Sequence, residues 1–178
     1  MRVRAAAQGD APAIQALYAH HVLHGTGTFE ETPPTLQEME ARMAAVISHG
    51  LPWVVAEEDE RLLAYAYASP FRLRAAYRYT AEVTVYAAAD AQRRGAGRAT
   101  LTMVVETCEA MGLHQLVAVI GGSDNAGSIG LHAALGFERV GVTPGLGWKH
   151  RRWHDVVWMQ KALNGGVQDV PRGAGLSL

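Results

Sequence analysis

The sequence predicts a single α/β domain in which helices flank a central sheet. Segments with the alternating or continuous apolar residues of strands are interspersed with segments whose apolar residues recur at helical spacing. The chain has 178 residues, of which 49% are hydrophobic, so one domain can bury a substantial core. No repeat or linker divides it. We expect the domain to cover residues 1–163 and residues 164–178, which are rich in glycine, to form a loosely ordered tail.

Composition argues against several classes of protein. A formal net charge of −1 disfavours a general binder of nucleic acid or anionic membrane, which would carry a basic excess. The single cysteine, Cys108, excludes an internal disulfide and suits a reducing cytosol, so we expect a cytoplasmic protein. It falls on the apolar face of a predicted helix, which favours a buried thiol over a nucleophile. No apolar run approaches the ~20 residues of a membrane span, and the first residues do not form a signal peptide.

The N-terminal part reads as a short strand followed by two amphipathic helices. Asp10 is the expected N-cap of the first helix, in which Pro12 suits an early position. Residues 25–34 are expected to form a loop, in which Phe29 is the one large apolar residue and can anchor the loop on the core. Thr35 begins a capping box that ends at Glu38 and starts the second helix.

Three histidines near the end of the first helix, His20, His21 and His24, invite a metal-binding interpretation. No acidic or cysteine partner accompanies them in a recognisable ligand pattern. We therefore expect an ordinary helix surface and no metal.

The next segments predict a hairpin, residues 53–57 and 62–68, and then a stretch, residues 69–78, that leaves the sheet. Arg72 and Arg74 lie two apart in this stretch, so an extended backbone would place both on one side. Two convergent guanidinium groups suit a carboxylate, a phosphinate or a pair of sulfone oxygens. Solvated loop arginines are the alternative.

Residues 80–87 predict a central strand whose two faces differ. Glu82, Thr84 and Tyr86 lie on one face, and valines lie on the other. A carboxylate on an otherwise buried strand is costly without a purpose. Glu82 is therefore either a general base that acts through water on a substrate ammonium group, or the partner of a neighbouring arginine in a salt bridge.

A glycine-punctuated, arginine-rich turn, residues 92–98, leads from this strand into a helix. Its backbone N–H groups can point at an anion, which the helix dipole also favours. The sequence lacks the third glycine of the dinucleotide fingerprint and the Lys-Ser/Thr pair of a P-loop. We expect it to bind the diphosphate of a nucleotide-like cofactor; a plain turn with solvated arginines is the alternative. The residues that would act are Arg93, Arg94, Gly95, Ala96, Gly97 and Arg98.

The C-terminal half predicts a buried strand at residues 115–120, a helix capped by Asp124 or Asn125 that ends at Gly136, and two closing strands. His132, in the middle of that helix, can return a proton near neutral pH or can be a packed structural histidine. The connection between the closing strands carries a basic run, residues 149–152. In a net acidic protein we do not expect this single short run to bind nucleic acid.

Several motifs, in one order along the chain, resemble the GCN5-related N-acetyltransferases, and within them the phosphinothricin acetyltransferase family. That family also contains acetyltransferases of methionine sulfone and methionine sulfoximine. The resemblance covers about residues 3–163. Its motifs are Thr28-Phe29-Glu30-Glu31, Ser69-Pro70-Phe71-Arg72-Leu73-Arg74, Ala76-Tyr77-Arg78-Tyr79-Thr80-Ala81-Glu82, the turn at residues 92–98, Val117-Ala118-Val119-Ile120-Gly121, Leu131-His132-Ala133-Ala134-Leu135-Gly136-Phe137 and Gly147-Trp148-Lys149-His150.

The resemblance implies the GNAT fold, with a central mixed, mostly antiparallel twisted sheet flanked by helices. It implies direct transfer of an acetyl group from acetyl-CoA to the amine of a small amino-acid-like acceptor, a homodimer and a role in resistance to antibiotics or herbicides. It makes Glu82 the catalytic base and adds His132 as the proton donor to the CoA thiolate. Implied acceptor-site residues are Phe29, Arg72, Arg74, Tyr77, Glu82 and Thr84. The implied acetyl-CoA site adds Val85, Tyr86, Ala87, Asn125 and Ser128 to the arginine-rich turn.

Two other functions stay open from the sequence. One is an acetyltransferase of another amine, such as a protein N-terminus or a polyamine. The other is a sensor that binds acyl-CoA without catalysis, against which the polar face of the Glu82 strand argues.

Overall fold

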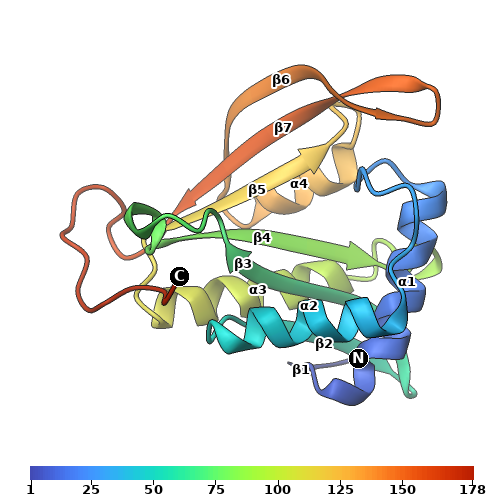
Figure 1. The fold of residues 1–178 in the computed structure, drawn as a ribbon, viewed down its shortest axis with the longest axis horizontal. Helices are drawn as coiled ribbons and strands as arrows, with labels where there is room; N and C mark the ends of the chain where they lie inside the picture. The colour runs from blue at the N-terminus through green and yellow to red at the C-terminus, as the bar shows by residue number, and fades with distance from the viewer.

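A computed structural model describes all residues from Met1 to Leu178 and contains one seven-stranded sheet with helices on both faces (Figure 1). The strand order is β1-β2-β3-β4-β5-β7-β6, and β4–β5 is the single parallel pair. The expected mixed, mostly antiparallel sheet is therefore confirmed. The elements are β1 (Arg2–Ala5), η1 (Gln8–Asp10), α1 (Ala11–His24), α2 (Leu36–Ser48), β2 (Trp53–Glu58), β3 (Arg61–Pro70), η2 (Ala75–Tyr77), β4 (Thr80–Ala87), η3 (Ala89–Ala91), α3 (Ala96–Ala110), β5 (Gln115–Gly121), α4 (Ala126–Ala134), β6 (Glu138–Lys149) and β7 (Arg152–Ala162).

Local signals set the ends of the N-terminal helices. Thr35 and Glu38 form the expected capping box, in which the Thr35 hydroxyl accepts from the Glu38 N–H and the Glu38 carboxylate accepts from the Thr35 N–H. Asp10 stands at the N-cap position of α1, but its carboxylate makes no cap hydrogen bond there. It accepts two hydrogen bonds from Arg4 instead, at 2.7 and 2.8 Å. A charge-assisted bidentate pair of this kind is stronger than a neutral cap.

The core lies between the sheet and its helices. Ile14 of α1 and Met43 of α2 are fully buried against one face, and Leu101 and Val104 of α3 against the other. Cys108 of α3 belongs to the same core, and burial raises the pKa of its thiol to about 12. The thiol is therefore protonated at neutral pH and is no nucleophile, as expected. No helix of the chain is both long enough and apolar enough to span a bilayer.

The two parallel strands at the centre of the sheet diverge, which prepares the site. β4 and β5 pair only from Thr80 and Gln115 to Val83 and Ala118. Beyond that register the strands separate, as Figure 1 shows. The opposite edge of β4 stays paired with β3 up to Ala87. The second half of β4 therefore presents one edge that no strand covers.

The C-terminal tail is better anchored than its composition suggests. Residues 164–178 form no helix or strand. However, Leu176 is only 6% exposed and joins the main core. The Leu176 N–H donates to the Arg78 carbonyl at 2.7 Å, and the Tyr79 hydroxyl donates to the Gly173 carbonyl at 2.7 Å. The tail thus returns to the segment that precedes β4.

Candidate active site

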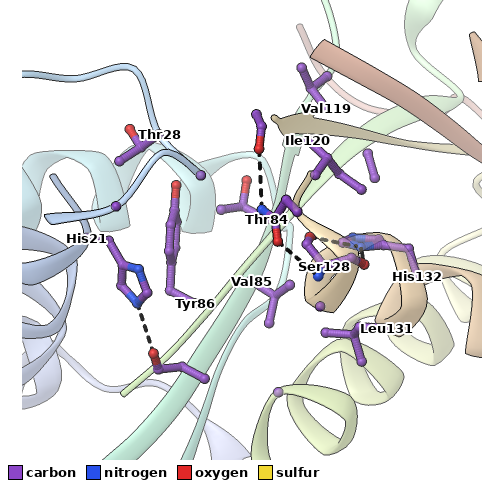
Figure 2. Close-up of a pocket in the computed structure, with 18 of the residues that line it drawn as sticks. His21, Thr28, Thr84, Val85, Tyr86, Val119, Ile120, Ser128, Leu131 and His132 are labelled. Atoms are coloured by element: carbon purple, nitrogen blue, oxygen red, sulfur yellow. Dashed lines mark hydrogen bonds between the residues drawn. The ribbon is translucent and has the colours of Figure 1, made fainter. Parts of the chain in front are cut away.

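A cleft of about 1160 Å³ opens where β4 and β5 part. Its walls come from β4, β5, α4, the turn before α3 and the loop that follows α1. Figure 2 shows Thr84 and Tyr86 on the side where Thr28 and His21 lie, and Val85 on the side of Leu131. The alternation along β4 therefore gives the cleft two chemically different walls.

The arginine-rich turn forms one end of the cleft. Gly95 precedes α3 with φ +83°, a left-handed conformation that glycine adopts without strain. None of the backbone N–H groups from Arg93 to Arg98 donates a hydrogen bond within the chain. Arg93 and Arg98 line the cleft beside them. Unpaired N–H groups, a helix N-terminus and two guanidinium groups are the features that favour binding of an anion.

Arg94 departs from the prediction that three arginines serve this site. Its guanidinium donates to the Glu58 carboxylate at the tip of the β2–β3 hairpin, and it does not line the cleft. Glu58, at the tip of this hairpin, therefore holds the outer face of the turn.

The middle of the cleft combines β4 with the start of α4. Val85, Tyr86 and Ala87 line it, as do Asn125 and Ser128. The Asn125 side-chain oxygen accepts from the Ser128 N–H at 3.2 Å, and its amide nitrogen donates to the Gly121 carbonyl at 3.3 Å. Asn125 is thus both the N-cap of α4 and a residue of the cleft wall.

Glu82 lies on the cleft wall without a partner for its carboxylate. It makes no hydrogen bond and no salt bridge, so the ion pair that the sequence left open is not formed. Burial raises the pKa of Glu82, and the positive charge of Arg72 acts in the opposite direction. An unpaired, partly desolvated carboxylate is a stronger base than a solvated one.

His132 lines the cleft, but its ring is hydrogen-bonded within its own helix, α4. It is 2% exposed, and its Nδ1–H donates to the Ser128 carbonyl at 2.8 Å. Its Nε2 is buried and has no hydrogen-bond partner. Burial lowers the pKa of His132, so the ring is neutral at neutral pH and Nε2 is a bare acceptor. This arrangement favours the structural role over the proton-donor role, both of which the sequence allowed.

The acceptor-site residues predicted from the sequence fall into two groups. Phe29 and Thr84 line the cleft with Glu82. Arg72 and Arg74 are exposed and are not part of its lining; the Arg72 guanidinium lies 4.8 Å from the Phe71 ring centroid. Tyr77 is 38% exposed and borders a second, smaller cavity of about 410 Å³.

Sequence reasoning missed several cleft residues. Tyr67 lies opposite Thr84 in the β3–β4 register and could have been found from the alternation along its strand. His21 donates from Nε2 to the Ala87 carbonyl at 2.8 Å, a contact 66 residues apart in sequence. Trp158 reaches the cleft from β7, and nothing in the sequence around it indicates a cleft residue.

The chain has no cluster of three or more His, Cys, Asp or Glu residues that could hold a metal ion.

The mixed sheet parts between two parallel strands, with a helix N-terminus at one end of the gap and the Glu82 carboxylate on its wall, and this arrangement fits the GNAT fold that the sequence motifs imply. The family model described as acetyltransferase (GNAT) domain matches residues 3–158. The chain belongs to this family.

Individual relatives align with this chain over most of their length. The chain is 50% identical over 169 residues to phosphinothricin N-acetyltransferase of Alcaligenes faecalis. This alignment covers 95% of this chain and 86% of the relative. It is 38% identical over 163 residues to the L-methionine sulfoximine/L-methionine sulfone acetyltransferase of Pseudomonas paraeruginosa, covering 91% and 94%. A crystal structure of a phosphinothricin acetyltransferase from Sinorhizobium meliloti in complex with acetyl-CoA superposes with a TM-score of 0.94 at 40% identity, covering 98% of this chain and 94% of that one.

Proposed function

We propose that this protein transfers the acetyl group of acetyl-CoA to the amino group of a small amino-acid-like acceptor of the phosphinothricin, methionine sulfone or methionine sulfoximine type. The observation that carries the proposal is the unpaired Glu82 carboxylate on the wall of a cleft whose other end is built for an anion. The relatives named for these acceptors support the choice of acceptor.

The residues of the cleft fit acetyl-CoA. The free N–H groups of the turn and the guanidinium groups of Arg93 and Arg98 match a diphosphate. The uncovered edge of β4 at Val85, Tyr86 and Ala87 suits the amide groups of the pantetheine arm, which can pair with it as an added strand would. Acetyl-CoA would supply the activated acetyl thioester.

Glu82 acts on the acceptor in this mechanism. An amino acid carries an ammonium group at neutral pH, and only the neutral amine attacks a thioester. Glu82 takes up that proton, directly or through one water molecule, and its raised pKa improves the match to the amine. Backbone N–H groups near the end of the β4 pairing stabilise the developing oxyanion. The buried Cys108 excludes that thiol as a covalent relay, which favours direct transfer.

The acceptor end would be formed by Phe29, Thr84 and Glu82, with Arg72 and Arg74 at its approach. Arg72 influences the pKa of Glu82, so the two side chains share one electrostatic environment. A guanidinium group suits the carboxylate and the phosphinate or sulfone oxygens of such acceptors.

The test is CoA release from acetyl-CoA with a panel of amines. We expect turnover with phosphinothricin or methionine sulfone, and an increased KM for the acceptor in Arg74→Ala. Activity only on peptides or polyamines would contradict the acceptor assignment, and binding of acetyl-CoA without turnover on any amine would reduce the protein to an acyl-CoA sensor.

We also propose that the protein acts in the cytoplasm as a homodimer that confers resistance to inhibitory amino acids. Exposed Trp148 and Trp153 on the β6–β7 hairpin, 5.2 Å apart between ring centroids, offer an apolar surface for a second subunit. Sedimentation of a monomer at micromolar concentration would contradict the dimer. Expression that fails to protect sensitive cells from phosphinothricin would contradict the resistance role.

A further inference from the structure

Lys149 is a buried lysine at the end of β6. It is 2% exposed, although it is the first residue of the basic run at residues 149–152. No carboxylate lies within salt-bridge distance of its ammonium group. Its one hydrogen bond runs from Nζ to the Thr28 carbonyl at 2.8 Å. Burying a charge is costly unless geometry compensates, so the single bond it makes needs an explanation.

That bond holds the loop that lines the acceptor end of the cleft. From the hairpin side, His150 Nε2 also donates to the Gly25 carbonyl at 3.3 Å. From the helical side, the Tyr18 hydroxyl lies 2.8 Å from Thr28 Oγ1 and donates to Glu30 at 2.9 Å. The loop is therefore fastened on both sides of Phe29.

The Phe29 ring between these anchors fits against glycine. A Cβ built on Gly147 would lie 2.3 Å from the ring, and one built on Gly121 would lie 3.2 Å from it. The ring of the buried His154 faces it with centroids 6.0 Å apart, and His154 in turn donates to the Lys149 carbonyl at 3.0 Å. Gly147 and His154, which contact the Phe29 ring, and Lys149, which holds its loop, thus lie at the same end of the β6–β7 hairpin.

We propose that Lys149 is a positioning residue that locks residues 25–30 against the β6–β7 hairpin and so fixes Phe29 as a rigid wall of the acceptor site. The inference deepens the proposed function and rests on it for the identity of the acceptor. Lys149 touches neither substrate; it acts through the Thr28 carbonyl and Phe29. A fixed apolar wall would select among acceptors by the shape of their side chains.

The first experiment replaces the ammonium group by an uncharged side chain of similar length in Lys149→Met. The Thr28 carbonyl, on a buried residue, then loses its partner. We expect the acceptor KM to rise roughly tenfold or more, with the acetyl-CoA KM changed by less than about twofold. Arg151→Met, an exposed charge on the same hairpin, is the matched control and should change neither.

A double-mutant cycle separates positioning from general destabilisation. If Lys149 acts through Phe29, Lys149→Met should add little to the loss of acceptor kcat/KM in Phe29→Ala. Multiplicative losses would overturn the inference. Should Lys149→Met fail to fold, Lys149→Gln, which keeps an N–H donor on a shorter stem, takes its place with the same two outcomes.

Hydrogen–deuterium exchange without substrates tests the anchor independently of turnover. Residues 25–30 should exchange faster in Lys149→Met than in the unsubstituted protein, while β5 keeps its protection. Unchanged protection would overturn the inference even if phosphinothricin is acetylated. Faster exchange in a protein that acetylates no amine of the panel would support the anchor and contradict the proposed function.

Discussion

Replacing Glu82 by glutamine should separate catalysis from stability. The amide has the size of the carboxylate but cannot take up a proton at neutral pH. Because the carboxylate has no hydrogen bond or salt bridge, the change leaves no group without its partner. We expect kcat to fall by about 10²- to 10⁴-fold, the usual contribution of a general base, which corresponds to about 2.7–5.4 kcal/mol of barrier.

The thermal stability of Glu82→Gln, in contrast to its kcat, should be unchanged or higher. The pKa of Glu82 is raised above its ordinary value of 4.5 by burial, so the folded protein holds this proton more tightly than the unfolded chain. Stability therefore declines as pH rises from the ordinary pKa of 4.5 through the raised pKa of the folded protein. The ionised carboxylate thus disfavours the fold at neutral pH. Glu82→Gln should keep or raise the thermal midpoint. Glu106→Gln, an exposed carboxylate on α3, should change neither quantity.

The assay is CoA release over a range of pH together with a thermal melt of each variant. Activity should fall on the acid side as Glu82 becomes protonated. Arg72→Ala removes the charge that lowers the pKa of Glu82, so this acid limb should move to higher pH. A Glu82→Gln enzyme with nearly normal kcat, or one that loses activity only because its midpoint drops, would refute the reasoning.

Three further predictions concern other parts of the chain. Arg93→Ala should raise the KM for acetyl-CoA roughly tenfold because a charge-assisted contact is lost, whereas Arg94→Ala, whose guanidinium bonds Glu58, should change it little; equal effects in steady-state kinetics would contradict this assignment. Leu176→Ala should lower the free energy of unfolding in urea by about 2 kcal/mol or more because it opens a cavity in the core, and an unchanged midpoint would show that the tail is loose. Burial lowers the pKa of His132, so stability should decline as pH falls through its ordinary value of 6.5, where only the unfolded chain gains the proton; His132→Asn should flatten this decline in melts at decreasing pH.

Local features of the site were predictable from the sequence because they depend on neighbours in the chain. The alternation of Glu82, Thr84 and Tyr86 follows from the period of a strand, and the left-handed Gly95 follows from turn chemistry. The Asn125 cap and the Thr35 capping box likewise each depend on a stretch of only four residues. Together with the family motifs, these signals were enough to predict the fold and to single out a turn and a carboxylate that both line the cleft.

Tertiary structure decided what depends on residues distant in sequence. The divergence of β4 and β5 creates the cleft, and it is a property of strand pairing that no single segment encodes. Arg93 lines the cleft, whereas Arg94 is held away from it by Glu58, which lies on the β2–β3 hairpin. Nothing local to the basic run marks Lys149 as buried, because its burial requires the loop at Thr28, 121 residues away. Leu176 reached the core for the same reason: a side chain is buried by what packs over it, and only the folded chain brings those residues together.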